Sequence, residues 1–400
     1  MKSDIVGQLW SNGEQNKTRR NNMPRQRIGI ITRPIGNAGL VPLSNLIDVI
    51  RSLSDIIYVI TGGDGMILKQ KNDPVVRLLE IKLKNKNGLL LRISNYICAQ
   101  VQITINLLRP AKSASIWIFF LDSHSMLLVV LAARLLRKKT FFLLAASIEN
   151  YAKAHNGVLP KVSVYSERIT FKLSNRIIVY TPNLIKVWGL EKYQSKISIA
   201  HEHVLDFDNF NILNDLSERD NLVGYIGRLS EEKGPMNFVH AISELSRDGS
   251  IKFIIGGSGR LLDKIRSYLK NNCLNANIEL IGWIPHTDLP PHLNNLRLLV
   301  VPSYSEGLPN IMLEAMACGT PVLATPVGAI PDIIADGDTG FLMENNSPEC
   351  IASNVIRALE HPDLKGVAQR ARSLVEREFT FERAVEGWRA VLEDVHDQKR

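Results

Sequence analysis

Two glutamates, Glu306 and Glu314, lie eight residues apart in the segment VPSYSEGLPNIMLEAMACGTP, one on each side of a predicted helix start. If the whole stretch were helical, the spacing would span about 12 Å, which suits a diphosphate with a sugar ring at either end. Each carboxylate would then accept hydrogen bonds from one ring, and the helix N-terminus would bind the phosphates. Such a pair also arises by chance in a chain of this length. Glu306 would then be an ordinary loop charge and Glu314 a solvated helix position.

The sequence around these glutamates predicts a strand, a loop, a helix and a second strand. Leu298–Val301 is a short apolar run and predicts a buried strand of a parallel sheet. Pro309 predicts the first helical position, because its missing N–H would have no partner there, and Gly319 predicts the end of the helix. Val322–Ala324 predicts the next strand. The loop therefore lies at the carboxyl end of a strand, where open α/β sheets bind ligands.

Two cations, Arg228 and Lys233, follow an earlier strand predicted at Leu222–Gly227. Together with a helix N-terminus they would form a binding site for a diphosphate. The alternative is a surface loop in which both charges are solvated. The later glutamate segment favours the first interpretation, because two cations and two carboxylates in related loops would suit both the phosphates and the sugar hydroxyls of one ligand.

Two weaker signals occur outside these loops. Gly36 and Gly39 follow a strand predicted at Arg27–Thr32 and would let the backbone approach a ligand, although a plain turn fits equally well. Asp206 and Asp208 have D-x-D spacing, which can hold a divalent metal on a nucleotide. No strand and helix surround this pair, so we predict no metal site.

The composition indicates a globular α/β protein with room for two domains, each with its own core, in 400 residues. Up to Asp215 there are 29 Lys and Arg against 15 Asp and Glu, and the remainder has 19 against 25. A basic first half favours anionic partners such as phospholipid headgroups, phosphorylated acceptors or nucleic acid, unless it is merely a lysine-rich surface. The four widely spaced cysteines indicate neither a zinc site nor a disulfide framework.

No segment predicts a signal peptide or a membrane-spanning helix. Residues 1–26 read as a polar arm, and polar residues interrupt the apolar run between Ile116 and Arg137. The basic end of that run, from Arg134 to Lys139, is compatible with a domain that rests on a membrane surface. We expect a cytoplasmic protein, with peripheral contact to an anionic membrane at its inner face as an open alternative.

Several stretches of the second half resemble family 4 glycosyltransferases, which have the GT-B fold. They are GRLSEEKG at Gly227–Gly234, GWIP at Gly282–Pro285, EGLPNIMLEAMACGTPVLAT from Glu306, and GDTGFL ending at Leu342. The first half is similar only in outline. The resemblance implies an α/β protein with two Rossmann-like domains facing a central cleft. It also implies a C-terminal helix that crosses back to the first domain.

On this basis we predict five parts: a polar arm at 1–26, an acceptor-side domain at 27–205, a linker at 206–220, a nucleotide-sugar domain at 221–379 and the returning helix at 380–400. The resemblance implies a retaining transferase of glycan biosynthesis that moves a hexose from a nucleoside-diphosphate sugar to a glycan or lipid-linked acceptor. It implies no required cofactor or metal and no nucleic-acid partner. A nucleotide-sugar epimerase or phosphorylase of the same fold and a non-catalytic nucleotide-sugar-binding module are the alternatives.

Transferred to this sequence, the resemblance implies a role for each candidate residue. Arg228 and Lys233 would neutralise the donor diphosphate, and Glu306 would bind hydroxyls of the transferred sugar near the reacting carbon. Glu314 would contact the nucleotide ribose, and the main chain of Gly307 and Leu308 would contact the phosphates. The main chain of Ile284 would contact the base. In the first half, the loop of Gly36 and Gly39 would contact the ligand and His124 the donor sugar. A purely structural role for His124 is the alternative.

Overall fold

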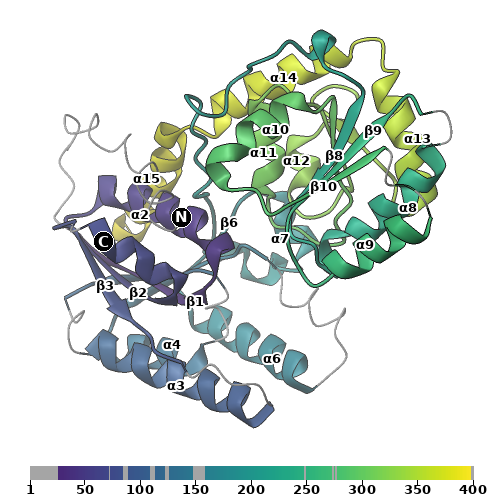
Figure 1. The fold of residues 1–400 in the computed structure, drawn as a ribbon. Helices are drawn as coiled ribbons and strands as arrows, with labels where there is room; N and C mark the ends of the chain where they lie inside the picture. The colour runs from purple at the N-terminus through teal and green to yellow at the C-terminus, as the bar shows by residue number, and fades with distance from the viewer. Residues whose placement is uncertain are drawn as a thin grey trace. The chain divides into compact units, whose positions relative to one another are not determined.

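The computed structural model describes residues 26–71, 73–83, 89–108, 113–121, 126–146, 158–246, 249–272, 274 and 277–397. The chain forms two compact units. Unit 1 comprises Met1–His203 together with Phe381–Arg400, and unit 2 comprises Val204–Thr380. Unit 2 is therefore one continuous segment, and unit 1 is completed by residues that follow it (Figure 1).

Unit 1 is built on a seven-stranded parallel sheet in the order β3-β2-β1-β4-β5-β6-β7. Because β1 pairs with both β2 and β4, the winding of the sheet reverses between β1 and β4. That is the switch point at which doubly wound sheets bind ligands. The strands are β1 (Arg27–Ile35), β2 (Ile56–Gly63), β3 (Val76–Glu80), β4 (Ile116–Phe119), β5 (Lys139–Leu143), β6 (Arg176–Val179) and β7 (Ile197–Ile199).

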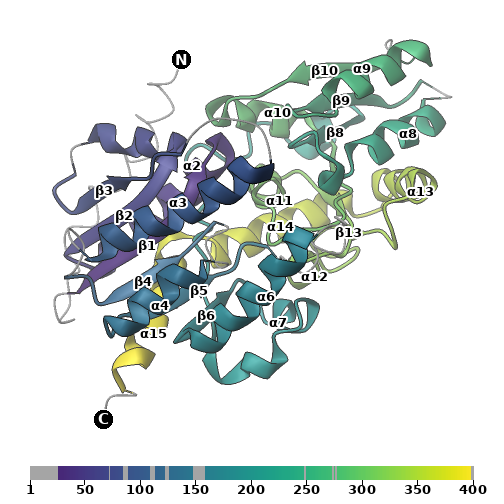
Figure 2. The same cartoon turned by 90° about the horizontal axis from the view of Figure 1, so that it is seen from below.

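Helices cover both faces of the unit 1 sheet (Figures 1 and 2). On one face α3 (Leu89–Leu108), α4 (Leu127–Leu135) and α6 (Val158–Leu173) lie in a row, and on the other α2 (Leu40–Leu53) packs against α15 (Phe381–Asp397). Trp388 of α15 is fully buried, and its indole N–H donates to the carbonyl of His201 at 3.1 Å. Shorter helices are η2 (Asn37–Gly39), η3 (Asp64–Lys71), α7 (Asn183–Val187) and η5 (Glu191–Lys196).

Unit 2 repeats the plan with a six-stranded parallel sheet in the order β10-β9-β8-β11-β12-β13. Its switch point lies between β8 and β11, which pair directly. The loops that follow these two strands therefore leave the same edge of the sheet side by side. The strands are β8 (Leu222–Ile226), β9 (Lys252–Gly256), β10 (Ile278–Gly282), β11 (Leu298–Val301), β12 (Val322–Ala324) and β13 (Phe341–Leu342).

Two groups of helices pack around the unit 2 sheet. In one group α8 (Pro235–Leu245) contacts α9 (Leu262–Asn271) and α13 (Pro348–Leu359); in the other α11 (Asn310–Ala317) contacts α10 (Leu289–Asn295) and α14 (Leu364–Glu378). Phe253 of β9 and Phe238 of α8 share one buried cluster, and each such side chain stabilises the fold by about 1.5–3 kcal/mol. Shorter helices are η6 (Leu216–Glu218), η7 (Glu231–Lys233), η8 (His286–Asp288) and α12 (Ile330–Ile333).

The strands predicted at Leu298–Val301 and Val322–Ala324 are confirmed at both ends as β11 and β12. Gly319 follows α11 with a left-handed backbone, φ 65°, as its predicted role at the helix end requires. The prediction that Pro309 is the first helical residue is wrong. Pro309 is the N-cap, with φ −76° and ψ 118°, because the chain is still extended where it leaves the loop and turns helical only at Asn310.

The segment 206–220, predicted as a linker, lies within unit 2. Oδ1 of Asp206 accepts from the backbone N–H of Asp208 at 3.2 Å, so the D-x-D pair holds a turn. Within the ranges described, no group of three His, Cys, Asp or Glu is placed to hold a metal ion. Nor does any helix in those ranges combine the length and the apolar character needed to cross a bilayer.

Candidate functional site

Lys233 and Glu306 meet at the switch point of unit 2, although 73 residues separate them. Lys233 lies in the loop after β8 and Glu306 in the loop after β11. The ammonium Nζ is 2.7 Å from Oε1 and 2.6 Å from Oε2 of the carboxylate, and the hydroxyl of Ser303 donates to Oε1 at 2.7 Å. Glu306 is only 8% exposed, so it is not an ordinary loop charge. Charge-assisted contacts of this kind are stronger than neutral hydrogen bonds.

Two glycines on neighbouring chain segments pack closely against the backbone of the loop after β11. Gly234, at the start of α8, has φ 67°, and a Cβ there would lie 2.1 Å from the carbonyl oxygen of Pro302. Gly328, after β12, has φ 62°, and a Cβ there would lie 2.3 Å from the carbonyl oxygen of Glu306 and 2.7 Å from that of Gly307. Both positions combine a left-handed backbone with close approach of another chain segment. Backbone packing therefore sets the position of Glu306.

The loop after β8 carries cations that face carboxylates of the same loop. Arg228 is exposed, and its Nη1 lies 3.6 Å from Oε1 of Glu232. Arg260, which follows β9, pairs with Glu231. Burial alone would raise the pKa of Glu232, but the hydrogen bond from Ser230 and the nearby cations lower it below its usual value. A phosphate entering this region would compete with carboxylates for the cations.

Glu314 points inward from α11 and is paired with a histidine. It is 7% exposed, so the alternative of a solvated helix position is wrong. Nε2 of His286 lies 2.8 Å from its Oε1, and the His286 ring is 5.2 Å from the ring of Phe210. Burial alone would lower the pKa of His286, but the hydrogen bond and charge of Glu314, with the charge of Asp206, raise it above 6.5.

His286 was not among the predicted site residues. Its signal in the sequence is its position directly after the GWIP stretch, which leads from β10 into η8. A histidine alone carries little information, and its partner Glu314 lies 28 residues away. Only the fold brings the imidazole and the carboxylate together.

The other predicted contacts of unit 2 lie on the same edge of its sheet. The carbonyl oxygen of Gly307 accepts from the N–H of Ala329 at 2.8 Å, and Leu308 is buried. Ile284 is half-buried after β10 and packs over Gly256, where a Cβ would lie 2.7 Å from its Cδ1. The loops that follow β10 and β11 thus place these residues on the edge of the sheet that also carries the Lys233–Glu306 pair.

The predicted residues of unit 1 have a different setting. Gly36 and Gly39 form a turn after β1 in which the N–H of Gly39 donates to the carbonyl of Gly36 at 2.9 Å. Their φ angles, −95° and −89°, are open to any residue, and a Cβ at Gly36 would touch none of the described residues within 4 Å. His124 lies outside the described residues. The loop of Gly36 and Gly39 is therefore a turn with open space beside its first glycine.

Unit 1 also buries a carboxyl group that the sequence did not single out. Glu202 follows β7 and is 2% exposed, and Tyr180, which follows β6, donates its hydroxyl to Oε1 at 2.9 Å. Burial raises the pKa of Glu202 to about 7, although the hydrogen bond from Tyr180 acts in the opposite direction. The second oxygen, Oε2, is buried and accepts no hydrogen bond from the described residues. Glu202 is therefore a carboxyl group that gains and loses its proton near neutral pH.

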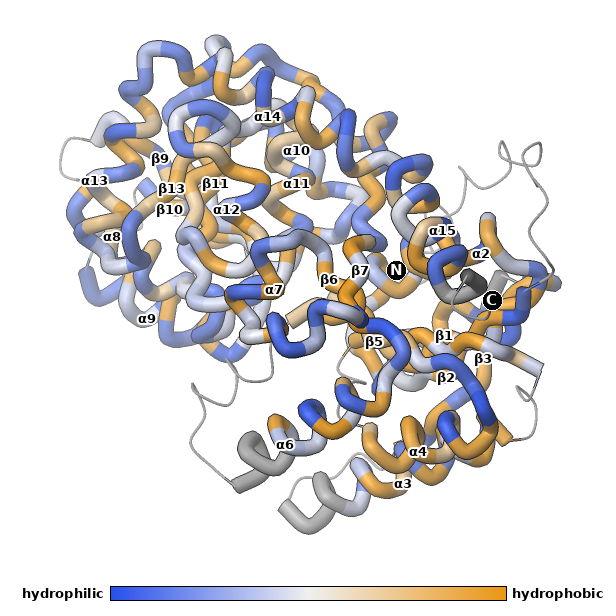
Figure 3. The backbone as a smooth tube through the Cα atoms, turned by 180° about the vertical axis from the view of Figure 1, so that it is seen from behind, coloured by the Kyte–Doolittle hydropathy of each residue, from blue (hydrophilic) through white to orange (hydrophobic). Residues whose placement is uncertain are grey.

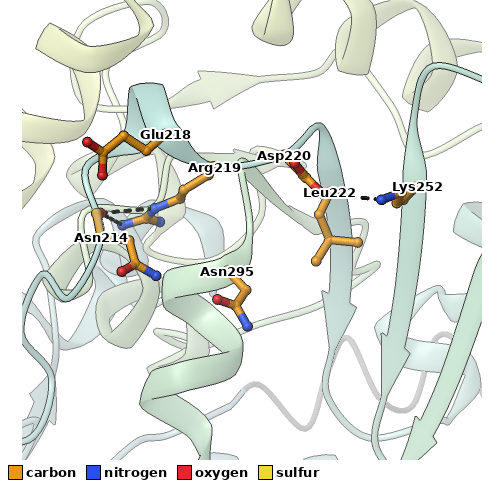
Figure 4. Close-up of a pocket in the computed structure, with 7 residues that line it drawn as sticks. All are labelled: Asn214, Glu218, Arg219, Asp220, Leu222, Lys252 and Asn295. Atoms are coloured by element: carbon orange, nitrogen blue, oxygen red, sulfur yellow. Dashed lines mark hydrogen bonds and ion pairs between the residues drawn. The ribbon is translucent and has the colours of Figure 1, made fainter.

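A hollow of about 430 Å³ lies at the opposite, amino edge of the unit 2 sheet, where β8 and β9 begin (Figure 4). Its cations are already engaged. The guanidinium of Arg219 donates to backbone oxygens of Asn214, Leu296 and Cys318, and Lys252 pairs with Asp220 at 3.2 Å. The contacts of Arg219 beside this hollow fix the start of unit 2. The candidate ligand-binding residues lie at the other edge of the sheet.

Comparisons with known proteins match the segment that carries these residues. Residues 207–374 match the family model of glycosyl transferases group 1. This segment belongs to the group 1 glycosyltransferases. It contains Arg228, Lys233, Glu306 and Glu314, so the predicted family is confirmed for the part of the chain that carries the motifs.

Two curated relatives each match a little under half of the chain. An uncharacterized glycosyltransferase of Methanocaldococcus jannaschii is 31% identical over 173 residues, which are 43% of this chain and 48% of that protein. The N-acetyl-alpha-D-glucosaminyl L-malate synthase of Bacillus anthracis is 29% identical over 181 residues, 45% of this chain and 47% of that protein. The chain thus spans about half the length of the curated relatives it matches.

A solved structure extends the likeness to nearly the whole chain. HepE of Anabaena, crystallised in complex with UDP, has a TM-score of 0.71 and 16% sequence identity, covering 92% of this chain and 99% of its own. At this identity the likeness concerns the fold. Together with the two parallel sheets, it confirms the predicted GT-B fold with two Rossmann-like domains.

Proposed function

We propose that the protein is a retaining glycosyltransferase that moves a hexose from a nucleoside-diphosphate sugar to an acceptor. The observation that carries the proposal is the contact of Lys233 with Glu306 at the switch point of unit 2, within a segment of the group 1 glycosyltransferases. The names of the relatives support sugar transfer. HepE, which shares the fold, has been crystallised with UDP and with UDP-glucose.

The donor diphosphate is placed, in this proposal, between the cations and the start of α11. Arg228 and Lys233 neutralise the charge that grows on the leaving diphosphate, which is where electrostatic catalysis acts most strongly. The N-terminus of α11, with the main chain of Gly307 and Leu308, binds phosphate oxygens. No metal is assigned a role, because the two cations supply the positive charge that the diphosphate needs.

Glu306 and Glu314 each bind the hydroxyl groups of a different ring of the donor. Glu306, held by Ser303, accepts hydrogen bonds from the transferred sugar, and Glu314, held by His286, accepts them from the ribose. In the reaction the bond from the anomeric carbon to the diphosphate oxygen breaks and a bond to the acceptor oxygen forms on the same face. The acceptor proton passes to the departing phosphate oxygen, so a second catalytic carboxylate is not needed.

The acceptor side is assigned to unit 1. Up to His203 that unit has 29 Lys and Arg against 12 Asp and Glu, which favours an acceptor that carries phosphate, such as a lipid-linked glycan precursor. The loop of Gly36 and Gly39 after β1, with open space beside Gly36, is the contact proposed for the ligand in this unit.

Lys233→Ala and Glu306→Gln test the donor site. Each variant is expected to lower the rate of sugar transfer by about 100-fold or more, because each removes a group that acts on charge in the transition state. Lys252→Ala is the matched control, since Lys252 is an exposed cation of the same unit at the amino edge of the sheet. Transfer is measured by product formation with a panel of nucleotide sugars, and folding by thermal unfolding. Full transfer activity in both variants would contradict the site.

Two further outcomes would replace the proposal. Conversion of the donor sugar without any acceptor would indicate an epimerase. Stabilisation of the fold by a nucleotide sugar, with no transfer and no hydrolysis, would indicate a binding module, because a ligand that binds only the folded state raises the unfolding midpoint.

A further inference from the structure

Helices α3 and α4 of unit 1 each expose a stripe of large apolar side chains. On α3 the stripe has helical spacing of four, four and three residues, and on α4 of three and four, so each forms one face of its helix. The exposed fractions range from 42% to 85%, with Leu135 the highest. We call these seven residues the α3–α4 face: Ile97, Val101, Ile105, Leu108, Leu128, Leu131 and Leu135.

This exposure is specific to one side of the unit. The α3–α4 face contributes seven of the fifteen large apolar residues exposed within the described ranges. Helix α2, on the opposite face of the same sheet, exposes none of them there, because α15 packs against it. Exposed apolar residues that are scattered singly are ordinary, whereas a contiguous group marks an interaction surface.

The two stripes are adjacent because the helices pack side by side. The backbone N–H of Leu128, at the start of α4, donates to Oε1 of Gln100 on α3 at 3.0 Å. Gln100 directly precedes Val101 of the exposed stripe. Figure 3 shows α3 and α4 as neighbouring segments of mainly apolar colour. They therefore form one apolar surface of two helices.

Among the described residues, the charges around this face are nearly all positive. The described side chains of α3 and α4 include no acidic residue, and Arg134 is the charged residue of α4. Arg137 is exposed just after α4, and Lys172 at the end of α6 near Arg134, whose Nη1 donates to the carbonyl of Leu173. Lys82, beside α3, is strongly exposed and lies 3.7 Å from Glu80, the acidic group at this edge.

We propose that the α3–α4 face docks on the surface of a lipid bilayer that contains anionic lipids. The apolar stripes enter the boundary between headgroups and acyl chains, while the basic residues at the ends of α4 and α6 contact lipid phosphates. A second copy of the chain fits less well, since each copy would bring the same positive edge. A bilayer supplies the opposite charge and accepts an aliphatic surface of any shape.

The inference goes beyond the proposed transfer reaction, because docking requires no donor. Docking would also bring the proposed transfer reaction to the bilayer surface, where a lipid-linked acceptor presents its sugar. Donor binding measured by thermal shift reports on unit 2 alone, whereas vesicle binding reports on the α3–α4 face. Either result can therefore fail while the other stands.

Vesicle cosedimentation tests the proposal. The whole chain is mixed with vesicles of phosphatidylcholine alone or of phosphatidylcholine and phosphatidylglycerol in equal parts. We expect sedimentation with the anionic vesicles that weakens as salt is raised. The double variant Leu131→Gln/Leu135→Gln is expected to bind at least about tenfold more weakly, and Arg137→Gln and Lys172→Gln each about fivefold more weakly.

Ile212→Gln/Leu213→Gln is the matched control, because these two apolar residues of unit 2 are also exposed and adjacent in sequence. The control is expected to bind vesicles like the unaltered chain, and thermal unfolding shows that both double variants fold. The proposal is overturned if the unaltered chain does not sediment with anionic vesicles at low salt. It is likewise overturned if the two double variants bind these vesicles with equal affinity. It is also overturned if the α3–α4 variant instead abolishes a dimer seen by sedimentation velocity, which would assign the face to a second copy.

Discussion

The two units have the same strand order around the switch point and differ in how the loops at that point are held. In unit 2, left-handed glycines at 234 and 328 bring backbone segments against the loop that carries Glu306. In unit 1, Gly36 and Gly39 have ordinary φ angles, and a Cβ at Gly36 would meet none of the described residues. Gly63, with φ 63°, meets the start of the unit 1 loop, because a Cβ there would lie 2.6 Å from the carbonyl oxygen of Ile35. The two loops therefore differ in the extent of backbone contact: neighbouring segments hold the loop of Glu306 from two sides, and hold the loop after β1 at its start.

The helices show the same contrast. In unit 2 they pack in groups around the sheet, and α11 buries Glu314 as part of the site. In unit 1 the α3–α4 face leaves aliphatic side chains exposed. A unit that binds a soluble nucleotide sugar needs a preformed site with little variation. A unit that meets its acceptor at a bilayer can select that acceptor partly through the protein surface that contacts the bilayer.

The sharpest way to break this comparison is to add a methyl group to a glycine in each unit. Gly328 and Gly189 have nearly equal φ angles, 62° and 63°, but only Gly328 faces another backbone segment. Gly189→Ala should lower the free energy of unfolding by about 1 kcal/mol through strain in the left-handed region. Gly328→Ala should lower it by about 3 kcal/mol, because the loop of Glu306 must also move. Chemical denaturation measures both.

Nucleotide-sugar affinity gives the second readout for this pair. Gly328→Ala should weaken the binding of the donor at least about tenfold, since a displacement near 1 Å at a polar site has effects of this size, and Gly189→Ala should leave it unchanged. Equal losses of stability and unchanged donor binding in both variants would show that the loop of Glu306 is no more tightly held than the turn at Gly189.

The second test concerns the buried carboxyl group of unit 1. The pKa of Glu202 rises from 4.5 to about 7 on folding, so the folded state binds its proton more tightly than the unfolded chain. This contribution to stability is complete below pH about 4.5 and is lost as the pH rises through 7, by roughly 3 kcal/mol. Glu202→Gln should remove that pH dependence. A variant that keeps the same slope of unfolding free energy between pH 5 and pH 8 would contradict the assignment.

The smallest effect is expected at the histidine pair of unit 2. The pKa of His286 is raised above 6.5, so the stabilisation from its charged contact with Glu314 is complete below that pH and is lost as the pH rises through the raised value. Glu314→Gln should lower the pKa of His286 and the unfolding free energy at pH 6 by about 0.5–1 kcal/mol. Imidazole NMR titration measures the pKa; an unchanged value would show that the pair is not charged.

Much of unit 2 was predictable because its site and its fold use the same residues. The run Leu298–Val301 predicts a buried strand, and Glu306 with Lys233 belongs to stretches that resemble a known family. The short edge strands β3 and β13 were missed, because Val76–Glu80 is half polar and Phe341–Leu342 has only two residues. An edge strand depends on its one neighbour more than on its own pattern.

The contacts that complete the site were not predictable from local sequence. His286 with Glu314, and Ser303 with Glu306, depend on which side chains the packed loops bring together. The burial of Glu202 depends on its position after β7 at the edge of the sheet. The length estimated between Glu306 and Glu314 took the whole stretch as helical, whereas the helix begins between them, close to its predicted start, and includes only Glu314.

The interrupted course of the chain through unit 1 has a consequence for biosynthesis. Helix α15 packs against α2 and buries Trp388, yet the ribosome makes it only after all of unit 2. Unit 2 is continuous and can fold as it emerges, since domains generally fold as units during synthesis. Until residues 381–397 are made, the face of α2 that α15 covers stays exposed to water. The nascent chain is therefore expected to depend on chaperones over that interval, and a ribosome that stalls after Thr380 would release a folded unit 2 attached to an incomplete unit 1.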